Sequence, residues 1–128
     1  MKLKILIARA VFPEVVESLG RHFEVESNPD DQQWSPEQLI EHLQGKQGVL
    51  TTGSECIDAA LLARCPELKI CANMFVGYNN FDLAAMSAAG VVATNVPAVL
   101  NETTADFGFA LLMATARRIT EAERFLRA

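Results

Sequence analysis

The chain has 128 residues, about half of them apolar, which is enough for one domain with a hydrophobic core. Its net charge of −5 is spread along the sequence without a basic stripe, which argues against nucleic acids and anionic membranes as partners. Three cysteines without metal-ligand spacing, and no signal peptide or membrane span, indicate a cytoplasmic protein with reduced, mostly buried thiols.

Short apolar runs alternate with amphipathic segments along the first hundred residues. The predicted strands are 3–8, 23–26, 48–52, 68–72 and 91–94. The predicted helices between and after them are 13–19, 36–43, 58–63 and 83–89. Strictly alternating strands and helices are typical of an α/β fold, so we expect a parallel sheet with helices on both faces.

Local signals set several of these boundaries. Ser35 can cap the second helix, with Pro36 at its first position and Gln38 at the spacing of a capping box. Trp34 is predicted to pack against the entry of that helix, and Gly90 to end the fourth. The polar residues expected to be simple surface groups are Asp30, Asp31, His22 and His42.

Residues 102–128 predict one long helix, capped by Asn101 or Thr103. From Phe107 to Ala116 the helix is apolar almost all round, and from Arg117 it becomes amphipathic. A helix of this composition needs to be enclosed on several sides. We therefore expect further protein or a partner chain to cover it.

The loop at Val76-Gly77 is the first candidate for chemistry. It follows the fourth predicted strand, and ligands of open α/β sheets bind at the carboxyl ends of strands. Gly77 lacks a Cβ, so the backbone can adopt unusual dihedrals and approach a ligand closely. Successive N–H groups there predict a cradle for a small carboxylate. An ordinary tight turn between strand and helix explains the same residues.

The segment Asn101–Asp106 is the second candidate. The N-terminus of a helix can hold an anion such as a phosphate, and Thr104 adds a hydroxyl. Simple capping of the helix is the alternative. The sequence contains no GxGxxG, P-loop, HExxH or GxSxG motif.

Several segments together resemble the D-isomer-specific 2-hydroxyacid dehydrogenases, especially the glyoxylate/hydroxypyruvate reductase and 2-ketogluconate reductase branch. The resembling segments are Leu68–Ile70, Val76–Asp82, Gly90–Val91, Asn95–Pro97, Glu102–Asp106 and Arg117–Arg118. The resemblance implies a flavodoxin-like substrate domain over residues 1–100. It also implies that residues 101–128 are the first helix of a Rossmann nucleotide-binding domain.

The resemblance further implies the roles of individual residues. The backbone amides of Val76 and Gly77 would hold the carboxylate of a small 2-keto or 2-hydroxy acid, and Val76 would also lie near the nicotinamide. Gly53 and Ser54 would border the substrate, and Thr104 would contact NAD or NADP. The helix over residues 102–128 would pack in a homodimer.

The family's glycine-rich fingerprint and its catalytic Arg, Glu and His have no counterparts in these 128 residues. We therefore expect the chain to be the amino-terminal part of such an enzyme, and to be inactive in hydride transfer by itself. A phosphoacceptor receiver is a poor alternative, because Ala8-Arg9-Ala10 and Thr51-Thr52-Gly53 stand where it needs acids. A non-catalytic flavodoxin-like binding or dimerisation module is the other alternative.

Overall fold

Five parallel strands form one sheet in the computed structural model, which describes residues 2–128. The strand order β2-β1-β3-β4-β5 is that of flavodoxin-like folds, so the predicted α/β class is confirmed. The elements in chain order are β1 (Lys4–Ile7), α1 (Pro13–Gly20), β2 (Glu24–Ser27), α2 (Pro36–Leu43), β3 (Gly48–Thr51), α3 (Ala59–Arg64), β4 (Ile70–Asn73), α4 (Leu83–Ala88), β5 (Val92–Thr94), α5 (Asn101–Ala116) and α6 (Ile119–Arg127).

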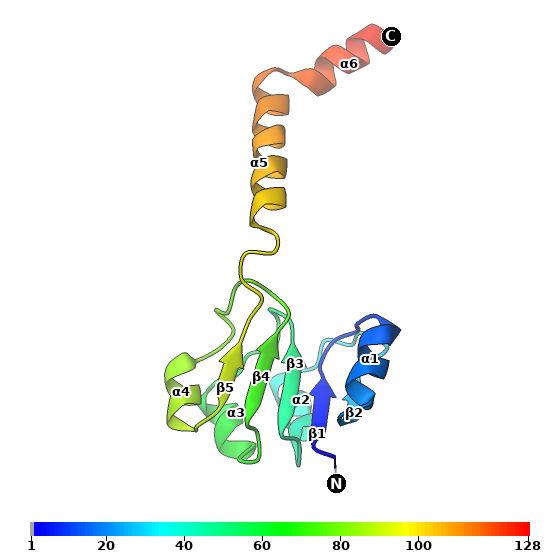
Figure 1. Cartoon of the computed structure of the whole chain (residues 1–128). Helices are drawn as coiled ribbons and strands as arrows, with labels where there is room; N and C mark the ends of the chain where they lie inside the picture. Colours follow the sequence, from blue (N-terminus) through cyan, green and yellow to red (C-terminus); the bar gives the residue numbers. More distant parts are fainter. Residues whose placement is uncertain (1) are drawn as a thin grey trace. The chain divides into compact units, whose positions relative to one another are not determined.

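Helices lie on both faces of the sheet, with α2 and α3 behind it and α1 in front near β2 (Figure 1). On the α2 and α3 side, Leu6 and Cys71 are buried in a core with side chains from α2, α3 and α4. On the opposite side, Ile5 lines an apolar groove together with Leu19 of α1. Ile70 on that side remains 42% exposed, so the core of the sheet is built mainly on one face.

Side-chain caps start three of the helices. Ser35 and Gln38 form the predicted capping box at α2, and Asp58 and Asp82 cap α3 and α4. Such caps satisfy N–H groups that have no partner inside the helix. They fix where each helix begins, and therefore where each preceding loop ends.

Trp34 stacks on His42, with ring centroids 4.0 Å apart, and packs against the core beside α2. His42 is half-buried, and its Nδ1 lies 2.6 Å from Glu26 on β2. The expectation that His42 is a simple surface residue was therefore wrong, because β2 brings it an acidic partner.

Gly90 ends α4 as predicted, with a φ of +69°. The Gly90 N–H donates to Ser87 O and the Val91 N–H to Met86 O, which are the two bonds of a Schellman motif. A residue with a Cβ is strained in this left-handed conformation. The glycine thereby directs the chain from α4 into β5.

Residues 98–128 form a second compact unit with two helices. The prediction of one helix over 102–128 was wrong, because Arg118 adopts a left-handed conformation (φ 52°) and separates α5 from α6. The Arg118 guanidinium then pairs with Glu121 in the first turn of α6. The predicted caps were also wrong, since α5 begins after Leu100 without a side-chain cap.

Apolar side chains are plentiful but unburied in this second unit. No residue between 98 and 128 is buried, and Phe107, Leu112 and Phe125 are all largely exposed. Among the described residues, 2–128, we find no helix with the length and apolar character needed to cross a membrane.

Candidate functional site

The predicted site residues lie in two loops at the carboxyl edge of the sheet and in one helix. Val76 and Gly77 are in the loop between β4 and α4, and Gly53 and Ser54 are in the loop between β3 and α3. Gly53, Ser54 and Phe75 line a common hollow of about 440 Å³, so the fold brings the two loops together. Thr104 is exposed on α5, in the second unit.

Three consecutive carbonyls of the loop over residues 75–78, here called the cradle loop, accept hydrogen bonds from neighbouring elements. The bonds run from the Val96 N–H to the Phe75 carbonyl (3.1 Å), from Asn95 Nδ2 to the Val76 carbonyl (2.8 Å) and from Asn73 Nδ2 to the Gly77 carbonyl (2.8 Å). The orientation of three successive peptide planes is therefore set by the ends of β4 and β5.

The N–H groups of the same peptides point the other way. In a trans peptide the N–H is antiparallel to the C=O, and no cis peptide occurs among the described residues. The N–H groups of Val76, Gly77 and Tyr78 are thus turned away from the three donors. None of them donates a hydrogen bond to another residue in the range 2–128. Successive unpaired N–H groups are the donor arrangement that an anion-binding loop requires.

Gly77 does not owe its place to an unusual backbone conformation. Its φ lies outside the left-handed region, and a Cβ built on it would meet no atom within 4 Å. The argument that this loop needs the dihedral freedom of glycine was therefore wrong. What the missing Cβ leaves is open space next to the N–H groups.

The loop after β3 folds around a buried carboxylate. Glu55 is only 8% exposed, and it accepts hydrogen bonds from the Thr52 N–H (2.7 Å), the Thr52 hydroxyl (2.9 Å) and the Ser54 hydroxyl (2.6 Å). Charge-assisted bonds of this kind are among the stronger ones in proteins. Gly53 therefore lies between two residues, Thr52 and Ser54, that are both hydrogen-bonded to Glu55.

Arg9, which follows β1, joins this loop to the turn after β2. Its Nε and Nη2 donate to the two oxygens of Asp31 at 2.8 Å each, and its Nη1 donates to Ser54 Oγ at 2.9 Å. The hydrogen bonds from the Arg9 guanidinium and the Ala10 N–H lower the pKa of Asp31 to about 2. Asp31 lies exposed in its turn, as interpreted, but it is also part of an ion pair with Arg9, which the sequence did not reveal.

The charge of Arg9 is already balanced within the hollow. Besides Asp31, the carboxylate of Glu55 lies 3.8 Å from Arg9 Nη1. Two carboxylates face one guanidinium, so these side chains do not provide a net positive field. An anion at this edge of the sheet would have to rely on peptide N–H groups instead.

Asn80 connects the two loops. Its Nδ2 donates to the carbonyls of Thr52 (3.0 Å) and Glu55 (2.9 Å), and its Oδ1 accepts from Asn73 Nδ2 (3.1 Å). Asn73 in turn holds Gly77. A continuous chain of hydrogen bonds therefore runs from the loop after β3 to the cradle loop.

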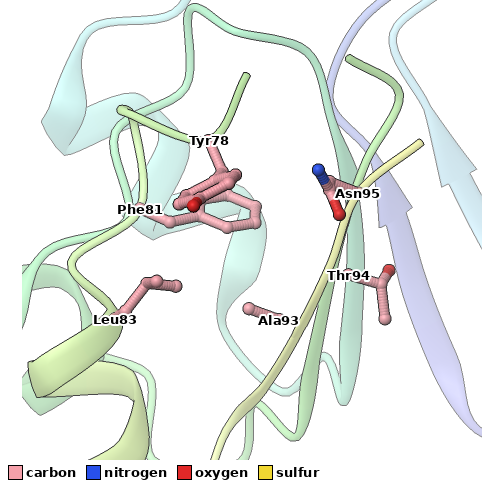
Figure 2. Close-up of a pocket in the computed structure, with 6 residues that line it drawn as sticks. All are labelled: Tyr78, Phe81, Leu83, Ala93, Thr94 and Asn95. Carbon is pink, nitrogen blue, oxygen red and sulfur yellow. The ribbon is translucent and has the colours of Figure 1, made fainter. Parts of the chain in front are cut away.

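A small cavity of about 140 Å³ lies beside the cradle loop. Figure 2 shows the rings of Tyr78 and Phe81 on one side of it and Asn95 on the other. The full lining is Tyr78, Phe81, Leu83, Ala93, Thr94 and Asn95. Apart from Asn95 and Thr94 this surface is mostly aromatic and aliphatic, so it suits the apolar part of a ligand better than a charge.

Sequence reasoning missed six polar residues that build this edge of the sheet. They are Arg9, Asp31, Glu55, Asn73, Asn80 and Asn95. Their common signal is position, because each lies at or after the carboxyl end of a predicted strand or in the loop that follows. That signal identifies the edge but does not identify the partners.

Comparison with known proteins places these features in a family. Residues 5–124 match the model of the D-isomer specific 2-hydroxyacid dehydrogenase catalytic domain. The chain is 43% identical over 127 residues to a glyoxylate reductase from Thermococcus onnurineus and 40% identical over 127 residues to one from Thermococcus kodakarensis. Each match covers 99% of this chain and 38% of the relative. The chain thus spans well under half the length of these relatives.

Solved structures agree with the sequence comparisons. The NADPH-dependent glyoxylate/hydroxypyruvate reductase from Sinorhizobium meliloti, in complex with NADP and malonate, superposes with a TM-score of 0.76 at 30% identity, over 99% of this chain and 38% of that chain. A 2-hydroxyacid dehydrogenase from Ketogulonicigenium vulgare gives a TM-score of 0.75 at 30% identity, over 99% of this chain and 40% of that chain.

Proposed function

The chain belongs to the D-isomer specific 2-hydroxyacid dehydrogenase family, and we propose that it forms the substrate-binding part of an enzyme that interconverts small 2-keto acids and D-2-hydroxy acids. Glyoxylate and hydroxypyruvate are the substrates we propose first, since the similar proteins are glyoxylate reductases. Residues 1–100 are the substrate domain in this proposal, and residues 101–128 begin the nucleotide-binding domain. We place this chemistry in the cytoplasm.

The observation that carries the proposal is the donor set of the cradle loop. Within residues 2–128 we find no acceptor for the N–H groups of Val76 and Gly77, and hydrogen bonds to the carbonyls of the same peptides orient them. They hold the carboxylate in this proposal, while Gly53 and Ser54 border the rest of the substrate. Support from a relative is that the Sinorhizobium meliloti enzyme was solved with malonate, a small carboxylate.

NAD or NADP is the proposed cofactor and the source of the hydride that the carbonyl carbon of the keto acid receives. Two residues of this chain fit such a group. Thr104 presents an exposed hydroxyl near the start of α5, and Val76 is 37% exposed in the cradle loop. Thr104 would contact the dinucleotide, and Val76 would lie against its nicotinamide.

Binding of a hydroxy acid to the 15N-labelled chain tests the carboxylate site directly. Glycolate and glycolamide form a matched pair of probes, because they differ only in the carboxylate. We expect glycolate to shift the amide signals of Val76, Gly77 and Tyr78 in a saturable way, and glycolamide to leave them unchanged. Equal shifts with both probes, or none with glycolate, would refute the carboxylate role of the loop.

Activity and assembly are separate parts of the proposal. The purified 128-residue chain is expected not to reduce glyoxylate with NADH or NADPH, and cofactor-dependent reduction would overturn this.

We also propose that residues 102–128 pair in a homodimer, since Phe107 and Leu112 are exposed on α5. Sedimentation over a range of concentrations should then show a dimer, and a Leu112→Asp variant should remain monomeric.

A further inference from the structure

The peptide between Val76 and Gly77 has glycine on its N–H side, and its carbonyl is anchored by a side chain that is only partly buried, that of Asn95. Glycine tolerates dihedral angles on both sides of φ = 0, so a peptide beside it can rotate with little steric cost. A half-turn of this peptide would bury the Gly77 N–H and present the Val76 carbonyl instead. The Val76 carbonyl oxygen would then face the bound anion and repel it.

Asn95 is placed to prevent this rotation. It follows β5 directly, and its Nδ2 donates to the Val76 carbonyl at 2.8 Å. It is the one hydrogen bond that we find for the Asn95 side chain among residues 2–128. Asn95 also forms one wall of the cavity beside the loop (Figure 2). Its position is fixed by the sheet, since β5 pairs with β4 in register through Thr94.

The other two carbonyls of the loop are anchored differently. The Phe75 carbonyl is held by a main-chain donor, the Val96 N–H, which no substitution other than proline removes. The Gly77 carbonyl is held by Asn73, which is 2% exposed and also bonded to Asn80. Asn95 is therefore the anchor that can be removed with the least damage to the core.

We propose that Asn95 is the positioning residue of the cradle, and that its side-chain amide holds the Val76 carbonyl so that the Gly77 N–H faces the substrate carboxylate. Asn95 does not touch the ligand in this proposal, and it acts through the peptide that it orients. The inference rests on the proposed function, because it assumes that the cradle loop binds a carboxylate.

The substitution Asn95→Ala removes the donor, and Asn95→Asp replaces it by an oxygen of similar size that repels the Val76 carbonyl. We expect both variants to bind glycolate roughly tenfold or more weakly, since a misaligned donor in an anion site costs much of its contribution. Asn79→Ala is the matched control. Asn79 is exposed in the same segment, and we find no side-chain hydrogen bond for it within residues 2–128. This control should bind like the original chain.

Two spectroscopic readouts separate positioning from general loss of structure. The 13C signal of the Val76 carbonyl should move in Asn95→Ala, because the carbonyl loses its hydrogen bond, while the amide signals of β1, β3 and β4 stay in place. Unchanged glycolate affinity in Asn95→Ala and Asn95→Asp, with the original chain binding at Val76 and Gly77, would overturn this inference and leave the proposed function standing. Absence of glycolate binding in the original chain would overturn both.

Discussion

Residues 2–97 and residues 98–128 use apolar side chains in opposite ways. In the first unit, side chains such as Leu6, Leu43 and Ile57 are at most 1% exposed and share one core. In the second unit, the 16-residue α5 is as apolar as a core helix, yet none of its residues is buried. Helices gain most of their stability from packing of an apolar face. The first unit therefore carries its own stabilisation, whereas α5 has the composition of a helix that packs against further protein.

Truncating one leucine in each unit should give the largest difference in unfolding free energy between the two units. Leu43→Ala removes a side chain that is 1% exposed, and it should cost about 2–5 kcal/mol of unfolding free energy. Leu112→Ala alters a side chain that is 62% exposed and belongs to the second unit, so it should change the unfolding free energy of the first unit by less than about 0.5 kcal/mol. Urea unfolding followed by the fluorescence of Trp34, the single tryptophan, measures both. Similar losses from the two variants would contradict the comparison.

Replacing a glycine by alanine should destabilise the first unit and stabilise the helix α5 of the second. Gly90→Ala forces a Cβ into a left-handed conformation and should cost about 1–2 kcal/mol in the first unit. Gly108→Ala lies inside α5 with open space around it, and it should favour that helix by up to about 1 kcal/mol. Trp34 fluorescence in urea reports the first change, and far-ultraviolet circular dichroism the second. A stabilising Gly90→Ala would show that the Schellman geometry is not needed.

The helix starts give a smaller contrast. Ser35→Ala removes both the hydroxyl of the capping box and its bond to the Gln38 N–H, at a cost of about 1 kcal/mol. Asn101→Ala should have little effect, because α5 begins without a side-chain cap. Trp34 fluorescence in urea measures the effect of Ser35→Ala, and far-ultraviolet circular dichroism measures the helicity of both variants. A loss of α5 helicity in Asn101→Ala as large as the loss from Ser35→Ala would indicate a cap that forms in solution.

The smallest expected effect is an acid dependence confined to the first unit. The pKa of Asp31 is lowered to about 2 by Arg9 and by the Ala10 N–H. A carboxylate with a lowered pKa contributes stability above its unfolded pKa, near 4, and loses it as the pH falls through about 2. Asp31→Asn should therefore flatten the unfolding free energy between pH 4 and pH 2, measured by Trp34 fluorescence. An unchanged slope would mean that the Arg9 pair is not populated.

The parts of the fold that sequence predicted are those set by neighbours in the chain. The capping box links Ser35 to a residue three positions away, and the two bonds that end α4 at Gly90 span three and five positions. The strand boundaries shifted by only one or two residues, with β2 starting at Glu24 and β4 at Ile70. Short-range geometry of this kind depends on local dihedrals and can be inferred from residue type.

The partners of the polar residues at the carboxyl edge could not be predicted in the same way. Arg9 reaches Asp31 and Ser54, which are 22 and 45 residues away, and Asn95 reaches back 19 residues to Val76. Such pairs depend on which strand ends lie next to each other, and the pattern of apolar runs leaves that order open. The corner at Arg118 was missed for a different reason, since no glycine, asparagine or proline marks it.

The cradle loop also bears on how such a site tolerates mutation. Its three outward donors belong to the main chain, so replacing the side chain of Val76 or Tyr78 leaves their number unchanged. Proline is the replacement that deletes a peptide N–H outright. The side chain of Tyr78 can therefore change and reshape the neighbouring cavity while the three backbone N–H groups remain, provided that the asparagine anchors Asn73 and Asn95 are kept.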